Sequence, residues 1–209
     1  MDVEKFKLAA GISLMLAKKW HPHVTATMER FDISTPLRQA AFIAQVGTES
    51  AGFTAVVESF NYSVDGLRAM FGKRIPFSVA AKLGRQAGER VVPVDRQVQI
   101  ANLVYGGRLG NAADEGWKFR GRGLKQITFR SNYEACSKAL GIDLTDNPDL
   151  LLEDKYAALS AGWFWSANGL NRFADVEDTV GATKRINGGT NGLTDRKYRY
   201  ALARKFLVA

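Results

Sequence analysis

The chain has 209 residues, of which 46% are hydrophobic, so it is long and apolar enough for one substantial folded domain and is not a disordered chain. Cys136 is the only cysteine, which excludes an internal disulfide, and with only two histidines no metal site is expected. The formal net charge of +8 favours an anionic partner, such as nucleic acid, a membrane surface or the bacterial envelope.

Apolar residues recur at helical spacing along most of the chain, whereas the alternation typical of strands is scarce. We therefore predict a mainly α fold. In chain order, the predicted helices cover residues 3–18, 23–30, 36–47, 63–71, 78–87, 95–104, 131–140, 154–168, 176–186 and 195–207. One small β-hairpin is expected between Trp117 and Phe129, with its turn at the sequence RGRG.

We predict a single domain over residues 1–209, with residues 64–113 as a candidate inserted helical module because glycines and prolines interrupt their weaker apolar pattern. No apolar run approaches the ~18 residues of a membrane-spanning helix, so the chain is not expected to be membrane-embedded. Asp2 and Glu4 precede the first apolar stretch, where a secretory signal would carry positive charge. We therefore expect the protein to fold in a cytoplasm, as a monomer.

A candidate catalytic carboxyl group follows the predicted helix 36–47, in the sequence AFIAQVGTESAGF (residues 41–53). Phe42, Ile43 and Val46 form one apolar stripe, and Glu49 is expected just beyond the end of the helix. Burial and the negative end of a helix both raise the pKa of a carboxyl group, as a general acid working near neutral pH requires. The alternative is an exposed glutamate at a helix end, with no catalytic role.

A second segment, WKFRGRGLKQITFRSNY (residues 117–133), combines glycines with polar and aromatic side chains. Its glycines allow a sugar ring to approach the backbone closely. The candidate sugar-binding groups are Gln126, Thr128 and Asn132 for hydrogen bonds, and Trp117 and Tyr133 for stacking. The alternative is a basic hairpin that packs its aromatic side chains inward.

A third segment, RINGGTNG (residues 185–192), has two adjacent glycines directly after Asn187. This pattern indicates a turn at which the backbone and the asparagine side chain both face a ligand. An ordinary helix end followed by a loop is the alternative. The segment does not fit a nucleotide-binding motif.

These three segments, in this order, resemble family 19 glycoside hydrolases, the chitinase-like group that includes many phage endolysins. The resemblance covers roughly residues 36–62 and 102–200, and it implies a lysozyme-like fold with a small β region beside the substrate cleft. It also implies that Glu49 is the proton donor and that Thr128 helps to hold the attacking water. Gln126, Asn132 and Asn187 match sugar-binding positions of the family.

The chain departs from the family pattern at several positions. Thr48 stands where the family often has histidine, and Leu124 and Lys125 stand where it often has Pro-Ile or Pro-Met. Asn191 replaces a glutamate that chitinases carry after INGG, and the disulfides of plant chitinases have no counterpart. These departures favour a compact, phage-type enzyme over a chitinase.

Inverting cleavage of a glycosidic bond requires a general base as well as an acid, with the two carboxyl groups ~6.5–9.5 Å apart. Glu58, in VVESFNYS, is the candidate base. On one continuous helix its Cα atom would lie ~13.5 Å from that of Glu49, so we expect the chain to leave the helix after Gly52 and turn back. Asp114 and Glu115 are the fallback candidates, and a mechanism with a single acid is the alternative.

From these features we expect an endolysin that hydrolyses the glycan strands of peptidoglycan by general acid/base catalysis. Lysine and arginine gather in residues 116–133 and 184–205, which suits an anionic envelope polymer. The alternatives are a lytic transglycosylase, a chitinase, and a non-catalytic basic module that binds cell wall or nucleic acid. No nucleic-acid partner is expected, because the chain lacks a zinc finger or an RNP-like signal.

No cofactor is expected either. The resemblance further implies a cellular route. The protein would accumulate in the host cytoplasm and reach the periplasm and cell wall once a separate protein has permeabilised the inner membrane.

Overall fold

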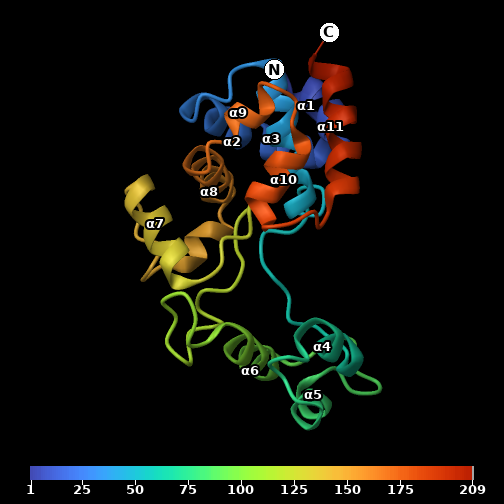
Figure 1. Cartoon of the computed structure of the whole chain (residues 1–209), viewed down its shortest axis with the longest axis vertical. Helices are drawn as coiled ribbons and strands as arrows, with labels where there is room; N and C mark the ends of the chain where they lie inside the picture. Colours follow the sequence, from blue (N-terminus) through green and yellow to red (C-terminus); the bar gives the residue numbers. More distant parts are fainter. Residues whose placement is uncertain (209) are drawn as a thin grey trace.

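The computed structural model describes residues 1–208, and its regular elements are helices, which confirms the mainly α class. The helices are α1 (Val3–Ala10), α2 (Leu14–Arg30), α3 (Pro36–Glu49), α4 (Val64–Phe71), α5 (Phe77–Leu83), α6 (Val94–Tyr105), α7 (Arg130–Leu140), the 3₁₀ helix η1 (Pro148–Leu152), α8 (Asp154–Ala167), α9 (Asn171–Ala174), α10 (Thr179–Asn187) and α11 (Leu193–Leu207). Both chain ends lie at one end of the elongated molecule, and α4, α5 and α6 form the opposite end (Figure 1). Within residues 1–208, no helix combines the length and apolarity needed to cross a bilayer.

The first predicted helix, 3–18, is divided in two in the structure. Gly11 adopts a left-handed conformation with φ of 63° and ends α1. Ser13 then caps α2 by accepting a hydrogen bond from the backbone of Leu16 at 3.3 Å. α2 continues through Pro22 to Arg30, so the boundary expected between residues 18 and 23 was wrong.

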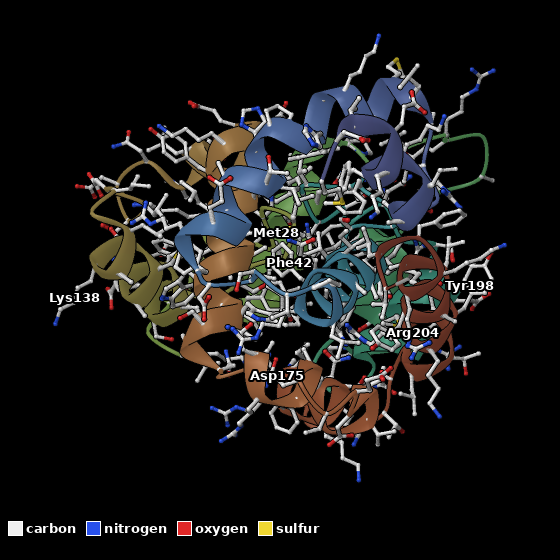
Figure 2. The ribbon with its side chains drawn as sticks, turned by 90° about the horizontal axis from the view of Figure 1, so that it is seen from above. Met28, Phe42, Lys138, Asp175, Tyr198 and Arg204 are labelled. Carbon is white, nitrogen blue, oxygen red and sulfur yellow. The ribbon has the colours of Figure 1, made fainter. Side chains whose placement is uncertain are left out.

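The main hydrophobic cluster packs the two terminal helices against α2, α3 and α8. Phe42 of α3 meets Trp165 of α8 edge to face, with ring centroids 5.4 Å apart. Phe42 and Met28 lie near the middle of the body in Figure 2, whereas Tyr198 of α11 lies at its edge. α3 packs more extensively against α11 than any other two helices pack together, so α11 fixes the position of α3.

A second cluster of buried side chains lies apart from the first and is formed by residues 60–104. Its members are Phe60, Leu67, Ile75, Ala80, Leu83, Val92, Ile100, Ala101 and Val104. It coincides with most of the segment 64–113, for which an inserted module stays a prediction. A third cluster joins α7, η1 and α8.

The predicted β-hairpin is not confirmed. Among residues 1–208 the structure has only isolated bridges, between Val57 and Arg122, Arg122 and Ile127, and Ser63 and Arg85. The extended runs stay short because Gly123, Gln126 and Phe129 have φ of 75°, 58° and 74°, and left-handed residues interrupt a strand.

Candidate active site

α3 ends at Glu49, two residues beyond the predicted end at residue 47, so Glu49 is the last residue of the helix and does not lie just beyond it. Beyond it, Ala51, Gly52 and Phe53 all have positive φ, of 49°, 71° and 64°, and they reverse the chain. The chain therefore turns back as expected, but it leaves the helix after Glu49 and not after Gly52. The side chain of Glu49 is 14% exposed, so it is mostly buried but remains open to solvent.

The turn after Glu49 is fixed from both sides. The Ser50 hydroxyl donates to the Val46 carbonyl at 2.7 Å and accepts from the Phe53 amide at 3.0 Å. The Trp20 indole donates to the Phe53 carbonyl at 2.9 Å. These bonds hold a turn of left-handed residues that would otherwise be strained, and with it the end of α3.

Two cations contact the carboxylate of Glu49. Lys125 Nζ donates to Oε2 at 2.9 Å, and Arg196 of α11 donates to Oε1. Arg196 is 2% exposed and also donates to the Gln45 side chain. Burial raises the pKa of Glu49, but the charges and hydrogen bonds of Lys125 and Arg196 outweigh burial and hold the pKa below its ordinary value. The expectation of a raised pKa was therefore wrong for the free protein, because the sequence did not show these two partners.

Glu58 is the carboxyl group whose pKa is raised. Burial is the main cause, and hydrogen bonds from Tyr105 and Gly121, with the charge of Arg120, offset it only in part. The Tyr105 hydroxyl donates to Oε1 at 2.7 Å, and the Gly121 amide donates to Oε2 at 3.1 Å. Glu58 is thus held on both oxygens by neutral donors, whereas Glu49 is held by cations.

One loop, residues 121–127, contacts both carboxyl groups. It pairs with the segment that carries Glu58, because the Glu58 amide donates to the Gly121 carbonyl and the Gly123 amide donates to the Val56 carbonyl, both at 2.8 Å. From the same loop, Lys125 reaches Glu49. A side chain at Gly121 has no room, because its Cβ atom would lie 2.9 Å from Gln126 Oε1 and 3.2 Å from Glu58 Oε2. The loop therefore fixes the two glutamates relative to each other.

Three predicted sugar-binding residues lie in this loop or within five residues of its end. Gln126 donates to the Gly123 carbonyl at 2.9 Å, and its side-chain oxygen lies beside Gly121. Thr128 donates to the Gln126 carbonyl at 3.1 Å and is half-buried. Asn132 is exposed in the first turn of α7 and donates to the Thr128 carbonyl at 2.8 Å. Their roles toward substrate stay predictions.

Asn187 is the exposed last residue of α10, and it donates to the Asn191 carbonyl at 2.9 Å. The loop after it comes close to the end of α3, since a Cβ atom at Gly192 would lie 3.5 Å from the Thr48 methyl group. The third predicted segment therefore lies beside the residue that precedes Glu49.

Of the two aromatic residues predicted to stack on sugars, Tyr133 is placed wrongly for that role. It is 0% exposed, and its hydroxyl accepts from Arg122 at 3.0 Å and donates to the Arg120 carbonyl at 2.7 Å. Tyr133 lies on the buried face of α7 and packs into the cluster that joins α7, η1 and α8. Trp117 is half-buried against Phe60, and the Arg120 guanidinium lies 3.8 Å from its ring centroid, so one ring face is already covered.

The fallback bases have other surroundings. Glu115 accepts from Arg130 Nε at 3.0 Å and from the Ala112 amide at 2.9 Å, so its carboxylate is engaged in a local ion pair. Arg130 is the main reason that the pKa of Glu115 is lowered. Asp114 is exposed. Neither contacts Glu49 or the loop 121–127.

Three residues that shape the site were not assigned a role from the sequence: Tyr105, Lys125 and Arg196. For Arg196 a signal existed, because it shares a helical stripe with the buried Tyr200, Ala203 and Leu207. An arginine on a buried stripe requires an acidic or polar partner in the interior. No comparable signal pointed to Tyr105 or Lys125. Their contacts depend on the paths of the loops that carry Glu58 and Lys125, and the sequence does not determine these paths.

No group of three or more histidine, cysteine, aspartate or glutamate side chains in the described part of the chain is arranged to hold a metal ion. The chemistry available at this site is that of two carboxyl groups in contrasting surroundings, which is the arrangement used for acid and base roles.

The sequence resembles known proteins over most of its length. The family model for chitinase class I matches residues 105–185. A glycosyl hydrolase family 19 domain-containing protein of Haemophilus influenzae (strain ATCC 51907 / DSM 11121 / KW20 / Rd) is 38% identical over 176 residues, which cover 83% of this chain and 82% of the relative. Endochitinase 1 of Theobroma cacao is 47% identical, but only over 51 residues, which are 24% of this chain and 16% of that protein.

Solved structures show the same fold. Chitinase C from Streptomyces griseus HUT6037 matches with a TM-score of 0.61 at 16% identity, covering 100% of this chain and 92% of that one. A bacterial family 19 chitinase matches with a TM-score of 0.57 at 22% identity, covering 99% of this chain and 94% of that one. Taken with the extended match to the Haemophilus influenzae protein, they show that this chain belongs to glycosyl hydrolase family 19.

Proposed function

We propose that the protein hydrolyses glycosidic bonds in the glycan strands of bacterial peptidoglycan, with Glu49 as general acid and Glu58 as general base. The observation that carries this proposal is that one loop, 121–127, contacts two largely buried carboxyl groups from separate segments. Family membership supports glycoside hydrolysis, and paired carboxyl groups are what that reaction requires.

In the proposed reaction, Glu49 donates a proton to the departing glycosidic oxygen, while ionised Glu58 accepts a proton from the attacking water. Thr128, at the end of the loop that contacts Glu58, is the proposed second partner of that water. The product of this route has an inverted anomeric centre and a reducing end. In the free protein Lys125 and Arg196 favour the ionised form of Glu49, so Glu49 has to gain a proton when substrate binds.

The charge of the chain supports peptidoglycan as the substrate. Peptidoglycan carries carboxylates on its lactyl groups and peptides, and the net charge of this protein is +8. The basic segment 116–133 contains the loop that contacts both glutamates. Positive charge around a site speeds the encounter with an anionic polymer, and salt weakens this effect.

Chitin is the second candidate substrate. It is favoured by the family model, which is that of chitinase class I, and by the short match to plant endochitinases. Turnover of soluble chitin oligomers at a rate equal to that of peptidoglycan strands would favour this candidate.

The proposed biological role is host-cell lysis by a phage-type endolysin. The protein would act on the wall after a separate protein has opened the inner membrane. Purified protein added to outer-membrane-permeabilised bacteria reproduces that last step and provides the assay.

The test replaces Glu49 with glutamine, which removes the acid and keeps the side-chain shape. We expect Glu49→Gln to abolish lysis of permeabilised cells while peptidoglycan binding is retained. Glu29→Gln, on the exposed surface of α2, is the matched control and should lyse normally. Normal lysis by Glu49→Gln would refute the assignment of the acid.

Mass spectrometry of the released muropeptides tests the reaction type. Hydrolysis leaves a reducing sugar at the new end, whereas a lytic transglycosylase leaves an anhydro sugar. Anhydro products would refute hydrolysis and favour a mechanism with a single acid.

A further inference from the structure

Of the two cations that contact Glu49, Lys125 is the more exposed and the less tightly held. Arg196 is 2% exposed, lies on α11 and is also bonded to Gln45, so it is fixed by its surroundings. Lys125 lies in the loop 121–127, its side chain is 15% exposed, and a lysine side chain has several rotatable bonds with which to change partner.

The ammonium group of Lys125 can form further hydrogen bonds. It has three N–H donors, and within residues 1–208 its one hydrogen bond is to Glu49 Oε2, at 2.9 Å. Its other close neighbour is the Phe164 ring, with the centroid 4.5 Å from Nζ, which attracts the cation but accepts no strong hydrogen bond. A second carboxylate that approached Lys125 would therefore meet a free donor.

The remaining charged groups at the end of α3 are already paired with one another. Asp195 of α11 accepts from the Thr48 hydroxyl at 2.7 Å and from Arg199 at 2.8 Å. Glu49 is thus the one acidic partner of Lys125 in the described part of the chain. If Lys125 turned to a new partner, Glu49 would keep a single cation, Arg196.

We propose that Lys125 determines specificity for glycans that carry a carboxylate beside the scissile bond, by exchanging its hydrogen bond to Glu49 for one to that carboxylate. This inference rests on the proposed function. A neutral glycan such as chitin offers no such partner, and Lys125 stays on Glu49. An acidic glycan withdraws Lys125 and leaves Glu49 free to act as the acid.

The charges balance in this exchange. Before binding, Lys125 and Glu49 form a pair of a cation and an anion. After binding, Lys125 and the substrate carboxylate form the equivalent pair, and Glu49 takes up one proton from water. That proton is the one which Glu49 then donates to the glycosidic oxygen. The exchange therefore couples the charge of the substrate to the protonation of the acid, which agrees with the lowered pKa of Glu49 in the free protein.

The test compares strands that differ only in charge. Peptide-free glycan strands, prepared with an amidase, carry free lactyl carboxylates, and conversion of these groups to methylamides makes the same strands neutral. We expect the wild-type protein to cleave the acidic strands with a kcat/KM about tenfold higher than the neutral ones. In Lys125→Met this ratio should fall to about one, and Lys125→Arg should restore it.

A pH profile separates this role from a merely structural one. On the neutral strands, Lys125→Met should move the acidic limb of kcat/KM to higher pH, because Glu49, the carboxyl group with the lower pKa, has lost one of its two cations. Arg196 remains on Glu49, and Asp195 and Arg199 keep their own contacts, so the alkaline limb, which Glu58 sets, should stay in place. Lys125→Gln repeats the test if the methionine variant does not fold.

Lys118→Met is the matched control. Lys118 is half-buried in the same basic segment, its Nζ lies 5.2 Å from the Phe119 ring centroid, and it makes no contact with Glu49. Its loss should slow both kinds of strand by the same factor. Intact strands with stem peptides distinguish the two carboxylate sources, since a preference for these alone would place the partner on the peptide and not on the lactyl group.

The possible failures are distinguishable. If the wild-type protein cleaves neutral, acidic and intact strands equally, or if Lys125→Met keeps the wild-type preference, the role of Lys125 is refuted and the proposed function stands. If the wild-type protein cleaves chitin oligomers and no peptidoglycan strand, the proposed function and this inference are both refuted.

Discussion

The Tyr105 hydroxyl donates a hydrogen bond to Oε1 of Glu58 at 2.7 Å, and this bond joins the end of α6 to the proposed general base. Burial raises the pKa of Tyr105, so the hydroxyl stays protonated and remains a donor at any working pH. A bond of this kind stabilises the ionised form of Glu58 over the neutral form.

Tyr105→Phe should therefore raise the pKa of Glu58 further. The pKa of Glu58 lies above that of Glu49, so Glu58 sets the alkaline limb of the kcat/KM profile, and this limb should move to higher pH. Between the two limbs kcat/KM should fall about tenfold, because the form with Glu58 ionised and Glu49 protonated becomes rarer, the equivalent of one hydrogen bond of ~1.4 kcal/mol. Tyr198→Phe, at an exposed site on α11, is the control and should leave the profile unchanged. A fixed alkaline limb in Tyr105→Phe would show that Glu58 is not the base.

Glu58→Gln should stabilise the protein at neutral pH while removing activity. Burial raises the pKa of Glu58 in the folded state above its value in the unfolded chain, so the folded protein holds this proton more tightly. Stability from this group is present in acid, below the unfolded pKa, and is lost as the pH rises through the folded pKa.

At pH 7 the variant should gain on the order of 1 kcal/mol in urea denaturation, the usual size of a stabilising change at a functional site. Near pH 4 the gain should shrink, because glutamate is then largely protonated in both states. Equal gains at both pH values would contradict the raised pKa of Glu58.

Arg196→Met should destabilise the protein strongly. The variant leaves Gln45 without its donor and Glu49 with Lys125 alone, and removal of one member of a buried ion pair costs about 3 kcal/mol. Urea denaturation measures the loss. Arg185→Met, at an exposed position of α10, should change the free energy of unfolding by less than about 0.5 kcal/mol.

A double-mutant cycle separates the ion pair from simple packing. In the Glu49→Gln background, Arg196→Met should cost clearly less than in the wild-type protein, because no buried charge is then left with a single partner. An identical cost in both backgrounds would show that Arg196 acts through packing.

The sequence was informative where a signal was local. Gly141 ends α7 as expected, with φ of 70°, and Pro36 begins α3. Gly11 was not recognised as a break, because the apolar pattern of residues 3–18 continues across it and only the left-handed backbone divides the helix. The hairpin was overpredicted, since nothing in the sequence shows that Gln126 and Phe129 adopt positive φ.

The sequence indicated which two carboxyl groups would lie near one loop, but it did not indicate their electrostatic surroundings. Glu49 and Glu58 do meet the same loop, as a two-carboxylate reading requires. The direction of each pKa depends on partners far away in the sequence, such as Arg196 for Glu49 and Tyr105 for Glu58. Such contacts follow from the packing of α11 and α6, which periodicity alone does not determine.

Tyr133→Phe tests the correction made for that residue. Its hydroxyl bonds to Arg120 and Arg122 in the interior, so the variant should lose about 1–2 kcal/mol of stability. Because the ring is sealed from solvent, KM for glycan strands should stay the same. A severalfold rise in KM with unchanged stability would restore Tyr133 as a sugar-binding residue.

The residues that hold the two glutamates belong to different hydrophobic clusters. Tyr105, which holds Glu58, packs against the cluster of residues 60–104, whereas α11, which carries Arg196, packs into the main cluster with α3. The loop 121–127, which contacts both glutamates, would have to deform if one cluster were displaced against the other. A small molecule that bound between the two clusters and separated them would therefore reduce glycosidase activity without contacting either carboxyl group.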